Sequence, residues 1–202
     1  MRIWDLTENK TKDLYVDSEE IPFRSVAITK TAKKIVAGNN VGNCFLWEQQ
    51  DGEFVPMQII EAHPDNYILK CQFSADDIFL ATCSSDRTCK VYKLELIERV
   101  NADDDEEESK QDDVTTTEEY QEEAVLSGHS GWVWDCDFTS DNEFLITVCT
   151  DGKARIWRMG KDEIRKQLIG HTKGITCLAF CDAKKAWLIK FHTDHLGVLG
   201  FW

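Results

Sequence analysis

The residue types with the most chemical potential in this sequence are two sets of histidine, threonine and aspartate. The sets are His63, Thr82 and Asp86, followed by His129, Thr147 and Asp151. In a nucleophilic triad, the histidine takes a proton from a hydroxyl and the carboxylate orients the imidazole. The same residue types also form buried structural networks, in which a carboxylate is tolerated because donors fill its acceptor sites.

The spacing of the two sets favours the structural interpretation. Threonine lies ten residues and aspartate six residues before an aromatic residue, which is Tyr92 in the first set and Trp157 in the second. A catalytic site is needed once, whereas a structural element is copied with every repeat. The residues that we expect to form a structural hydrogen-bond network in each repeat are His63, Thr82, Asp86 and Tyr92, then His129, Thr147, Asp151 and Trp157.

No other motif in the sequence points to an enzyme. Outside the repeats there is no carboxylate pair, no nucleophile beside a base and no phosphate-binding loop. We therefore expect a protein with no catalytic residues, no cofactor, no bound metal and no small-molecule substrate.

The aromatic residue that follows each set belongs to a longer repeat. Stretches 35–47, 80–92 and 145–157 each contain a short apolar run, a tight turn and a second run that ends in an aromatic residue. With Trp4 and Trp202 included, these aromatic residues are 43, 45, 65 and 45 residues apart. An acidic insertion accounts for the long interval, so the period is about 45 residues, as in a four-stranded WD40 blade.

The fold predicted from this repeat is all-β, a partial WD40-type β-propeller over residues 1–202. About four blades are present, whereas such a ring usually closes with about seven. The expected blade ends lie near Trp47, Tyr92, Trp157 and, with a short gap in the alignment, Trp202.

The two outer repeats depart from the pattern. The first has Ala37 and Val41 where the others have threonine and aspartate. In the last, the alignment puts Lys190 at the threonine position and Asp194 in the turn. The sequence also opens on the end of a repeat, at residues 2–6, so we expect a truncated product, an incomplete gene model or a fragment that needs a partner.

Most of the negative charge lies in one segment. Residues 103–123 contain 12 acids and one base, which supply −11 of the net charge of −14. This composition predicts a disordered, solvated insertion over residues 101–123. The alternative is contact with a basic partner or regulated modification around residues 115–117. Lysine and arginine form no cluster elsewhere, which argues against a nucleic-acid partner.

The eight cysteines are expected to be core residues. The sequence has no Cys-x-x-Cys pair, and Cys44 and Cys89 each lie three residues before a repeat-ending aromatic residue. Cysteines that follow a repeat in this way behave as small apolar residues rather than metal ligands. There is no apolar run of about 18 residues and no signal-peptide pattern, so we expect no membrane span and a cytoplasmic protein.

Four stretches of the sequence resemble one WD-repeat family. They are GNCFLWE (42–48), residues 61–92, residues 131–157 and GHTKGITCLAF (170–180). In this order they are similar to the C-terminal half of the G-protein-beta-subunit-like subunit of target of rapamycin (TOR) complexes, whose pattern lacks the acidic insertion. The resemblance implies a non-catalytic scaffold that binds and stabilises the TOR kinase domain. The fold also suits an adaptor of another assembly, such as a ubiquitin-ligase substrate receptor or an RNA-processing complex.

A partner-binding surface is predicted at one rim of the propeller. In the stretch 128–136, Val133 is expected to face the sheet packing, while Trp132 and Trp134 lie at the rim. Large aromatic side chains at a polar rim are typical interface anchors. The alternative is that one tryptophan of the pair packs between blades. The predicted partner-binding residues are Tyr67, Leu69, Ser85, Trp132, Trp134 and Thr150.

Overall fold

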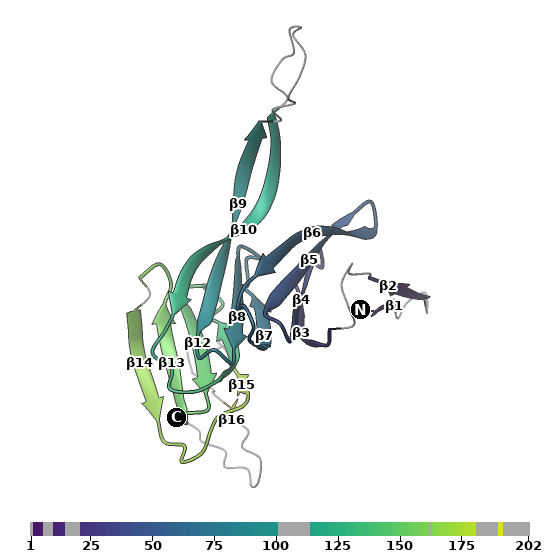
Figure 1. The fold of residues 1–202 in the computed structure, drawn as a ribbon. Coiled ribbons are helices and arrows are strands. Elements are labelled where there is room, and N and C mark those ends of the chain that lie inside the picture. The colour runs from purple at the N-terminus through teal and green to yellow at the C-terminus, as the bar shows by residue number, and fades with distance from the viewer. Residues whose placement is uncertain are drawn as a thin grey trace, which may run out of the picture.

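The computed structural model describes residues 2–5, 10–14, 21–100, 114–161, 163–180 and 190–191, and every regular element within them is a β-strand. Figure 1 shows the sheets arranged side by side, with the long strands β9 and β10 projecting from the body. No helix in this part of the chain has the length and apolar character that crossing a membrane requires. The prediction of an all-β chain is confirmed.

Three antiparallel sheets of four strands make up the body. The first contains β3 (Phe23–Ile28), β4 (Lys34–Asn39), β5 (Asn43–Gln50) and β6 (Glu53–Glu61). The second contains β7 (Ile68–Phe73), β8 (Phe79–Ser84), β9 (Cys89–Val100) and β10 (Val114–Leu126). The third contains β11 (Val133–Phe138), β12 (Phe144–Cys149), β13 (Lys153–Arg158) and β14 (Glu163–Ile169). Neighbouring strands follow one another along the chain, so each sheet is a meander.

Two small sheets lie at the ends of the described chain. They are β1 (Arg2–Asp5) with β2 (Lys10–Asp13), and β15 (Leu178–Ala179) with β16 (Lys190–Phe191). Trp4, on β1, is 63% exposed, whereas the repeat-ending Trp47 is buried. Lys190 pairs with Ala179 across the last sheet. The turn and end predicted for the last repeat, at positions 194 and 202, lie outside the described residues.

The hydrophobic core lies between neighbouring sheets, because each sheet is apolar on both faces and needs a sheet on either side. One cluster joins the first and second sheets and includes Val36, Leu46, Ile68 and Leu80. A second cluster joins the second and third sheets and includes Val91, Val133, Leu145 and Trp157. All eight side chains are buried, which leaves the turns at the strand ends to carry polar contacts.

A glycine turn fixes the first sheet against the segment that carries His63. Gly42 adopts φ +96°, and a Cβ at this position would lie 1.7 Å from the carbonyl oxygen of His63. The Gly42 carbonyl accepts hydrogen bonds from the backbone N–H groups of Ala62 and His63, both at 2.9 Å. No L-residue with a side chain fits so close to this backbone, so the turn between β4 and β5 requires glycine.

The strands β9 and β10 continue beyond the body as a two-stranded arm (Figure 1) and pair along the whole length of β10. The prediction of disorder over residues 101–123 is therefore wrong for residues 114–123, while residues 101–113 lie outside the described part of the chain. The β-branched residues that open β10 favour a strand, and pairing with β9 satisfies its backbone despite the acidic composition. Tyr120 anchors the arm, since it is buried and its hydroxyl donates to the carbonyl of Asp77 at 2.9 Å.

Candidate functional site

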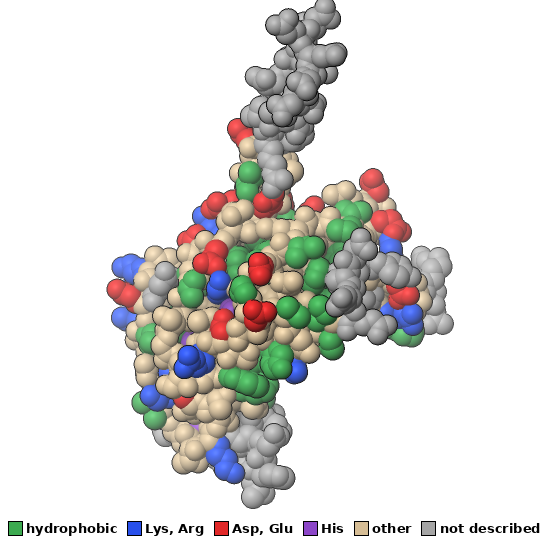
Figure 2. Space-filling view, in the orientation of Figure 1, with side chains coloured by type: hydrophobic (Ala, Val, Ile, Leu, Met, Phe, Trp, Pro, Cys, Tyr) green, Lys and Arg blue, Asp and Glu red, His purple; other side chains and the backbone are tan. Residues whose placement is uncertain are grey.

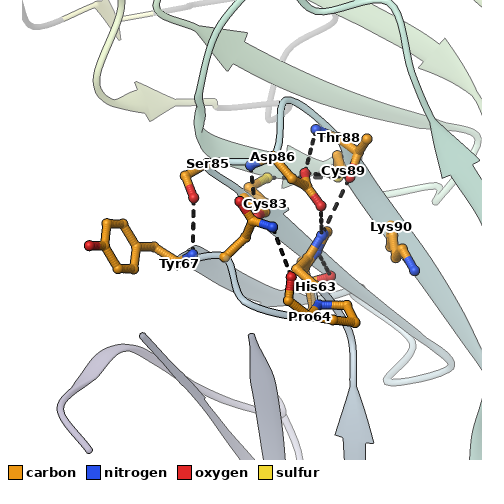
Figure 3. A network of polar contacts seen from close by, with 12 residues as sticks. His63, Pro64, Tyr67, Cys83, Ser85, Asp86, Thr88, Cys89 and Lys90 are labelled. Atoms are coloured by element: carbon orange, nitrogen blue, oxygen red, sulfur yellow. Dashed lines mark hydrogen bonds and ion pairs between the residues drawn. The ribbon is translucent and has the colours of Figure 1, made fainter. Parts of the chain in front are cut away.

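The first network consists of His63, Thr82 and Asp86 and ties three parts of the second sheet together. His63 precedes β7, Thr82 lies on β8, and Asp86 lies in the turn between β8 and β9. His63 Nε2 is 2.9 Å from Thr82 Oγ1, and His63 Nδ1 is 2.7 Å from Asp86 Oδ2. Figure 3 shows the carboxylate of Asp86 between His63 and Thr88, whose hydroxyl donates to Asp86 Oδ1 at 2.7 Å. His63 therefore contacts both other members of the predicted trio.

The carboxylate of the first network is held in its ionised form. Burial by itself raises the pKa of Asp86, but hydrogen bonds from His63 and Thr88 outweigh it and lower the pKa to about 2. An ionised carboxylate only accepts hydrogen bonds, so His63 Nδ1 carries the proton that it shares with Asp86. The lowered pKa means that the ionised form stabilises the folded state.

The second network consists of His129, Thr147 and Trp157 and lies in the third sheet. Thr147 Oγ1 is 2.8 Å from His129 Nε2 and accepts a hydrogen bond from Trp157 Nε1 at 2.9 Å. The rings of His129 and Trp157 are also in contact, with centroids 5.4 Å apart. Burial is the largest cause that lowers the pKa of His129, and the nearby cation of Arg155 adds to it.

Asp151 does not join His129, which corrects the prediction for the second network. Its carboxylate pairs with the buried Arg155, with Nη2 and Oδ2 2.6 Å apart, and accepts the backbone N–H of Ser130 at 3.2 Å. Burial raises the pKa of Asp151, but the hydrogen bonds from Arg155 and the backbone lower it to about 2. Within the described residues, His129 Nδ1 has no hydrogen-bond partner.

The residue four positions after the turn aspartate explains this difference between the networks. In the third sheet it is Arg155, whose buried guanidinium reaches back to Asp151. In the second sheet it is Lys90, whose ammonium pairs with Glu122 on β10 at 2.8 Å and leaves Asp86 for the histidine. Arg155 is a network residue that the repeat alignment missed, and its position four residues after the aspartate was the available signal.

Tyr92 lies in the predicted place but does not make the predicted hydrogen bond. Its ring is buried in the core between the first two sheets, yet its hydroxyl finds no hydrogen-bond partner among the described residues. Burial raises the pKa of Tyr92 well above its usual value. In the third sheet, the indole N–H of Trp157 donates to Thr147 from the side of its ring. The hydroxyl of Tyr92 lies at the tip of its ring, so it occupies a different point from that N–H.

Neither network can act as a nucleophilic site. The hydroxyl-bearing residues Thr82 and Thr147 are completely buried, so no substrate reaches their oxygen atoms. Both are already engaged in internal hydrogen bonds with a histidine. The geometry therefore matches a structural role, in which each histidine links a loop to a strand within the blade.

An exposed aromatic cluster, which we call the aromatic rim, consists of Tyr67, Trp132 and Trp134. The rings of Tyr67 and Trp132 meet edge to face with centroids 6.1 Å apart, and those of Trp132 and Trp134 are 5.6 Å apart. Tyr67 and Trp132 come from different sheets and are 40% and 42% exposed. Trp134 is half-buried. The structure thus brings together three of the six residues predicted for partner binding.

Two further predicted residues support the aromatic rim from the turns. Ser85 exchanges hydrogen bonds with the backbone of Tyr67, accepting from its N–H at 2.9 Å and donating to its carbonyl at 3.1 Å. Thr150 accepts the indole N–H of Trp134 at 2.9 Å, and its own backbone N–H donates to the carbonyl of Trp132 at 3.0 Å. These contacts hold the rings in place without covering them.

The sixth predicted residue contributes less surface. Leu69 lies on β7 and is half-buried. Trp134 donates its indole N–H to the exposed Thr150, and its ring lies tilted against that of Trp132. Arg24 on β3 adds a cation at 4.8 Å from the ring centre of Tyr67, and its Nε also donates to Asn40. No repeat position marked Arg24, so only the packing of neighbouring sheets places it here.

One face of the molecule is mixed in character. Figure 2 shows hydrophobic side chains in patches that are bordered by acidic and basic groups. Six of the seven described cysteines are buried and none forms a disulfide, in keeping with core positions.

Comparisons with known proteins agree with this architecture. The family "WD40: WD domain, G-beta repeat" matches residues 54–93 and 120–158. Each matched stretch begins on the outermost strand of one sheet and ends on the third strand of the next, β6 to β9 and β10 to β13. A sequence repeat therefore bridges two sheets and joins them covalently. A chain in the "Crystal Structure of Mitotic Checkpoint Complex" has the same fold, with a TM-score of 0.72 at 13% identity over 94% of this chain and 52% of that one.

Similar sequences include several proteins named for TOR complexes. "Target of rapamycin complex subunit LST8" from Bos taurus is 31% identical over 91% of this chain and 53% of its own length, and the Rattus norvegicus protein is 32% identical over 90% and 52%. "Non-functional target of rapamycin complex subunit LST8-2" from Arabidopsis thaliana is 34% identical over 60% of this chain and 33% of its own. The chain thus spans about half the length of the mammalian relatives. It is a WD40-repeat chain with the fold of a partial β-propeller, and its sequence is related to the LST8 proteins.

Proposed function

We propose that the chain is a non-catalytic WD-repeat subunit of a TOR complex and that it binds the TOR kinase domain through the aromatic rim. The observation that carries the proposal is the exposed contact between Tyr67 and Trp132, two rings from adjacent sheets with no core role. The relatedness to proteins named LST8 supports the choice of partner.

The aromatic rim has the physical properties of an interface anchor. Tyrosine and tryptophan bury a large area on binding and lose little conformational entropy, because each has two rotatable side-chain bonds. The hydrogen bonds from Ser85 and Thr150 order the rim before a partner arrives, which lowers the entropic cost of association. Arg24 adds a guanidinium that can pair with an acidic group of the partner.

The burial of the polar side chains in the two networks supports a scaffold role. The hydroxyls of Thr82 and Thr147 are buried and engaged with the Nε2 atoms of the two histidines, while the exposed rim presents aromatic rings. We propose a cytoplasmic location for this complex, to be tested by imaging of the tagged chain.

The test is binding of the full chain to a purified TOR kinase domain. The double variant Trp132→Ala with Trp134→Ala is expected to weaken the complex by about 1,000-fold, since each hot-spot aromatic contributes about 2 kcal/mol and about 1.4 kcal/mol is a factor of ten. Solubility should change little, because both side chains lie at the surface. The matched control is Trp4→Ala, which removes an exposed tryptophan on a separate small sheet.

Unchanged kinase binding by the folded double variant would contradict the proposed surface. A second measurement checks the partner itself, by affinity capture from cells followed by mass spectrometry. Recovery of a cullin adaptor or of splicing factors without a TOR kinase would favour the alternative role as an adaptor of another assembly.

A further inference from the structure

Three cysteine side chains meet inside the interface between the second and third sheets. They are Cys83 on β8, Cys89 on β9 and Cys136 on β11, and their sulfur atoms all lie within 4.8 Å of one another. All three side chains are buried. They come from three strands of two sheets, so their spacing in the sequence shows no metal-binding motif.

The positions of these sulfur atoms suit a single small cation. Cys83 and Cys89 face each other across β8 and β9, with their Sγ atoms 3.7 Å apart. Cys136 approaches the pair from the neighbouring sheet. Three sulfurs around a metal in one plane, with bonds of about 2.3 Å, would lie about 4.0 Å from each other. The cluster therefore needs only sub-ångström movements to reach three-coordinate geometry.

We propose that Cys83, Cys89 and Cys136 form a binding site for one copper(I) ion. Thiolates are soft ligands that select Cu(I) or Zn²⁺, and structural zinc almost always takes four ligands. Among the described residues the group offers three sulfurs and no fourth histidine, cysteine or carboxylate atom within the same distance. Three soft ligands match the low coordination number of Cu(I).

Binding is a ligand exchange without electron transfer. Each S–H bond that breaks yields a thiolate that bonds to copper, its proton passes to solvent, and copper remains in the +1 state. The exchange becomes more favourable as pH rises, since protons compete with the metal.

The chain contains a matched cysteine pair that lacks the third ligand. Cys44 and Cys71 meet between the first and second sheets, with Sγ atoms 3.9 Å apart. Cys44 occupies the same repeat position as Cys89, and the residue opposite it is Gly38, where the other site has Cys83. A Cβ at Gly38 would lie 2.9 Å from Cys71 Sγ, so this interface has no room for a third sulfur.

The experiment is anaerobic titration of the folded full chain with Cu(I) in competition with a chromophoric Cu(I) chelator. The wild-type chain is expected to hold one Cu(I) per chain, and X-ray absorption of the loaded protein should show three sulfur neighbours at about 2.3 Å. Cys89→Ala is expected to lower the affinity by at least about 100-fold, a loss no smaller than that seen when supporting residues of metal sites are removed. Alanine is tolerated at this repeat position, because Ala154 occupies it in the third sheet.

The control is Cys44→Ala, which removes a cysteine from the matched pair and should leave Cu(I) binding unchanged. Equal loss of affinity in the two variants would overturn the assignment, as would two sulfur neighbours in the absorption spectrum. If Cys89→Ala proves unstable, Cys136→Ser tests the same site from the neighbouring sheet. A wild-type chain that fails to retain Cu(I) against the chelator would overturn the proposal without any variant.

Discussion

The two networks predict that equivalent threonines contribute unequally to stability. Thr147 Oγ1 bonds to two partners, His129 Nε2 at 2.8 Å and Trp157 Nε1 at 2.9 Å. Thr82 Oγ1 bonds to one histidine, at 2.9 Å, because the hydroxyl of Tyr92 has no partner among the described residues. Replacement of either threonine by valine exchanges the hydroxyl for a methyl of similar size and leaves the former partners buried.

The expected magnitudes follow from the number of partners left without a bond. A buried polar group that loses its partner costs about 1 to 3 kcal/mol. Thr82→Val should therefore lower the free energy of unfolding by about 1 to 3 kcal/mol, and Thr147→Val by about 2 to 5 kcal/mol. The difference between the two variants should be about 1 to 3 kcal/mol, the cost of one further partner left without a bond, because both positions are completely buried on the second strand of a sheet.

The assay is urea unfolding of the full chain, followed by circular dichroism and by tryptophan fluorescence. Coincident transitions and unchanged slopes would show that the variants differ in stability rather than in compactness. Hydrogen exchange of the Trp157 indole N–H provides a local readout, which should accelerate in Thr147→Val and stay protected in Thr82→Val. Equal losses for the two variants, or a larger loss for Thr82→Val, would refute the reasoning.

Three further predictions concern the same networks. The folded-state pKa of Asp86 and of Asp151 is about 2, against 3.8 ordinarily. Each ionised carboxylate therefore contributes about 2 kcal/mol to the free energy of unfolding above pH 4, and this contribution is lost as pH falls from 4 to 2. In an acid titration, the free energy of unfolding of Asp86→Asn should decline less steeply than that of the wild type. Tyr92→Trp should raise the midpoint of urea unfolding by the equivalent of about 1 kcal/mol, because an indole N–H can reach the hydroxyl of Thr82 in the first network. A lower midpoint would contradict this prediction. Arg155→Ala should destabilise by about 3 to 5 kcal/mol, because it leaves the largely buried carboxylate of Asp151 unpaired. Lys90→Ala, which removes a solvent-exposed pair, should cost less than about 1 kcal/mol, and similar thermal midpoints for these two variants would contradict the burial argument.

Sequence periodicity determined the strands and the residues that connect them. The aromatic residues Trp47 and Trp157 recur with the blade period, and both are buried. Alternating apolar residues and tight turns are local properties, which a sequence states directly. The same alignment placed His63 with Thr82 and Asp86, because a repeat of fixed length puts matching residues in matching positions.

The tertiary structure decided which neighbour each polar group chose. Asp86 and Asp151 have the same repeat position, yet one bonds to histidine and the other to Arg155. The choice depends on whether another chain segment engages the cation four residues later, as Glu122 on β10 does for Lys90. Such competition between partners distant in sequence is invisible to an alignment of repeats.

The acidic segment and the cysteines show the same difference between what the sequence determines and what the tertiary structure determines. Composition predicted disorder, but pairing with β9 supplies hydrogen bonds to residues 114–123, and composition does not report a partner strand. The repeat placed Cys89 and Cys136 in the core, and the burial of both agrees with that placement. That their sulfurs converge with Cys83 follows only from the distance between two sheets, because the sequence orders residues along one dimension and a site is formed in three.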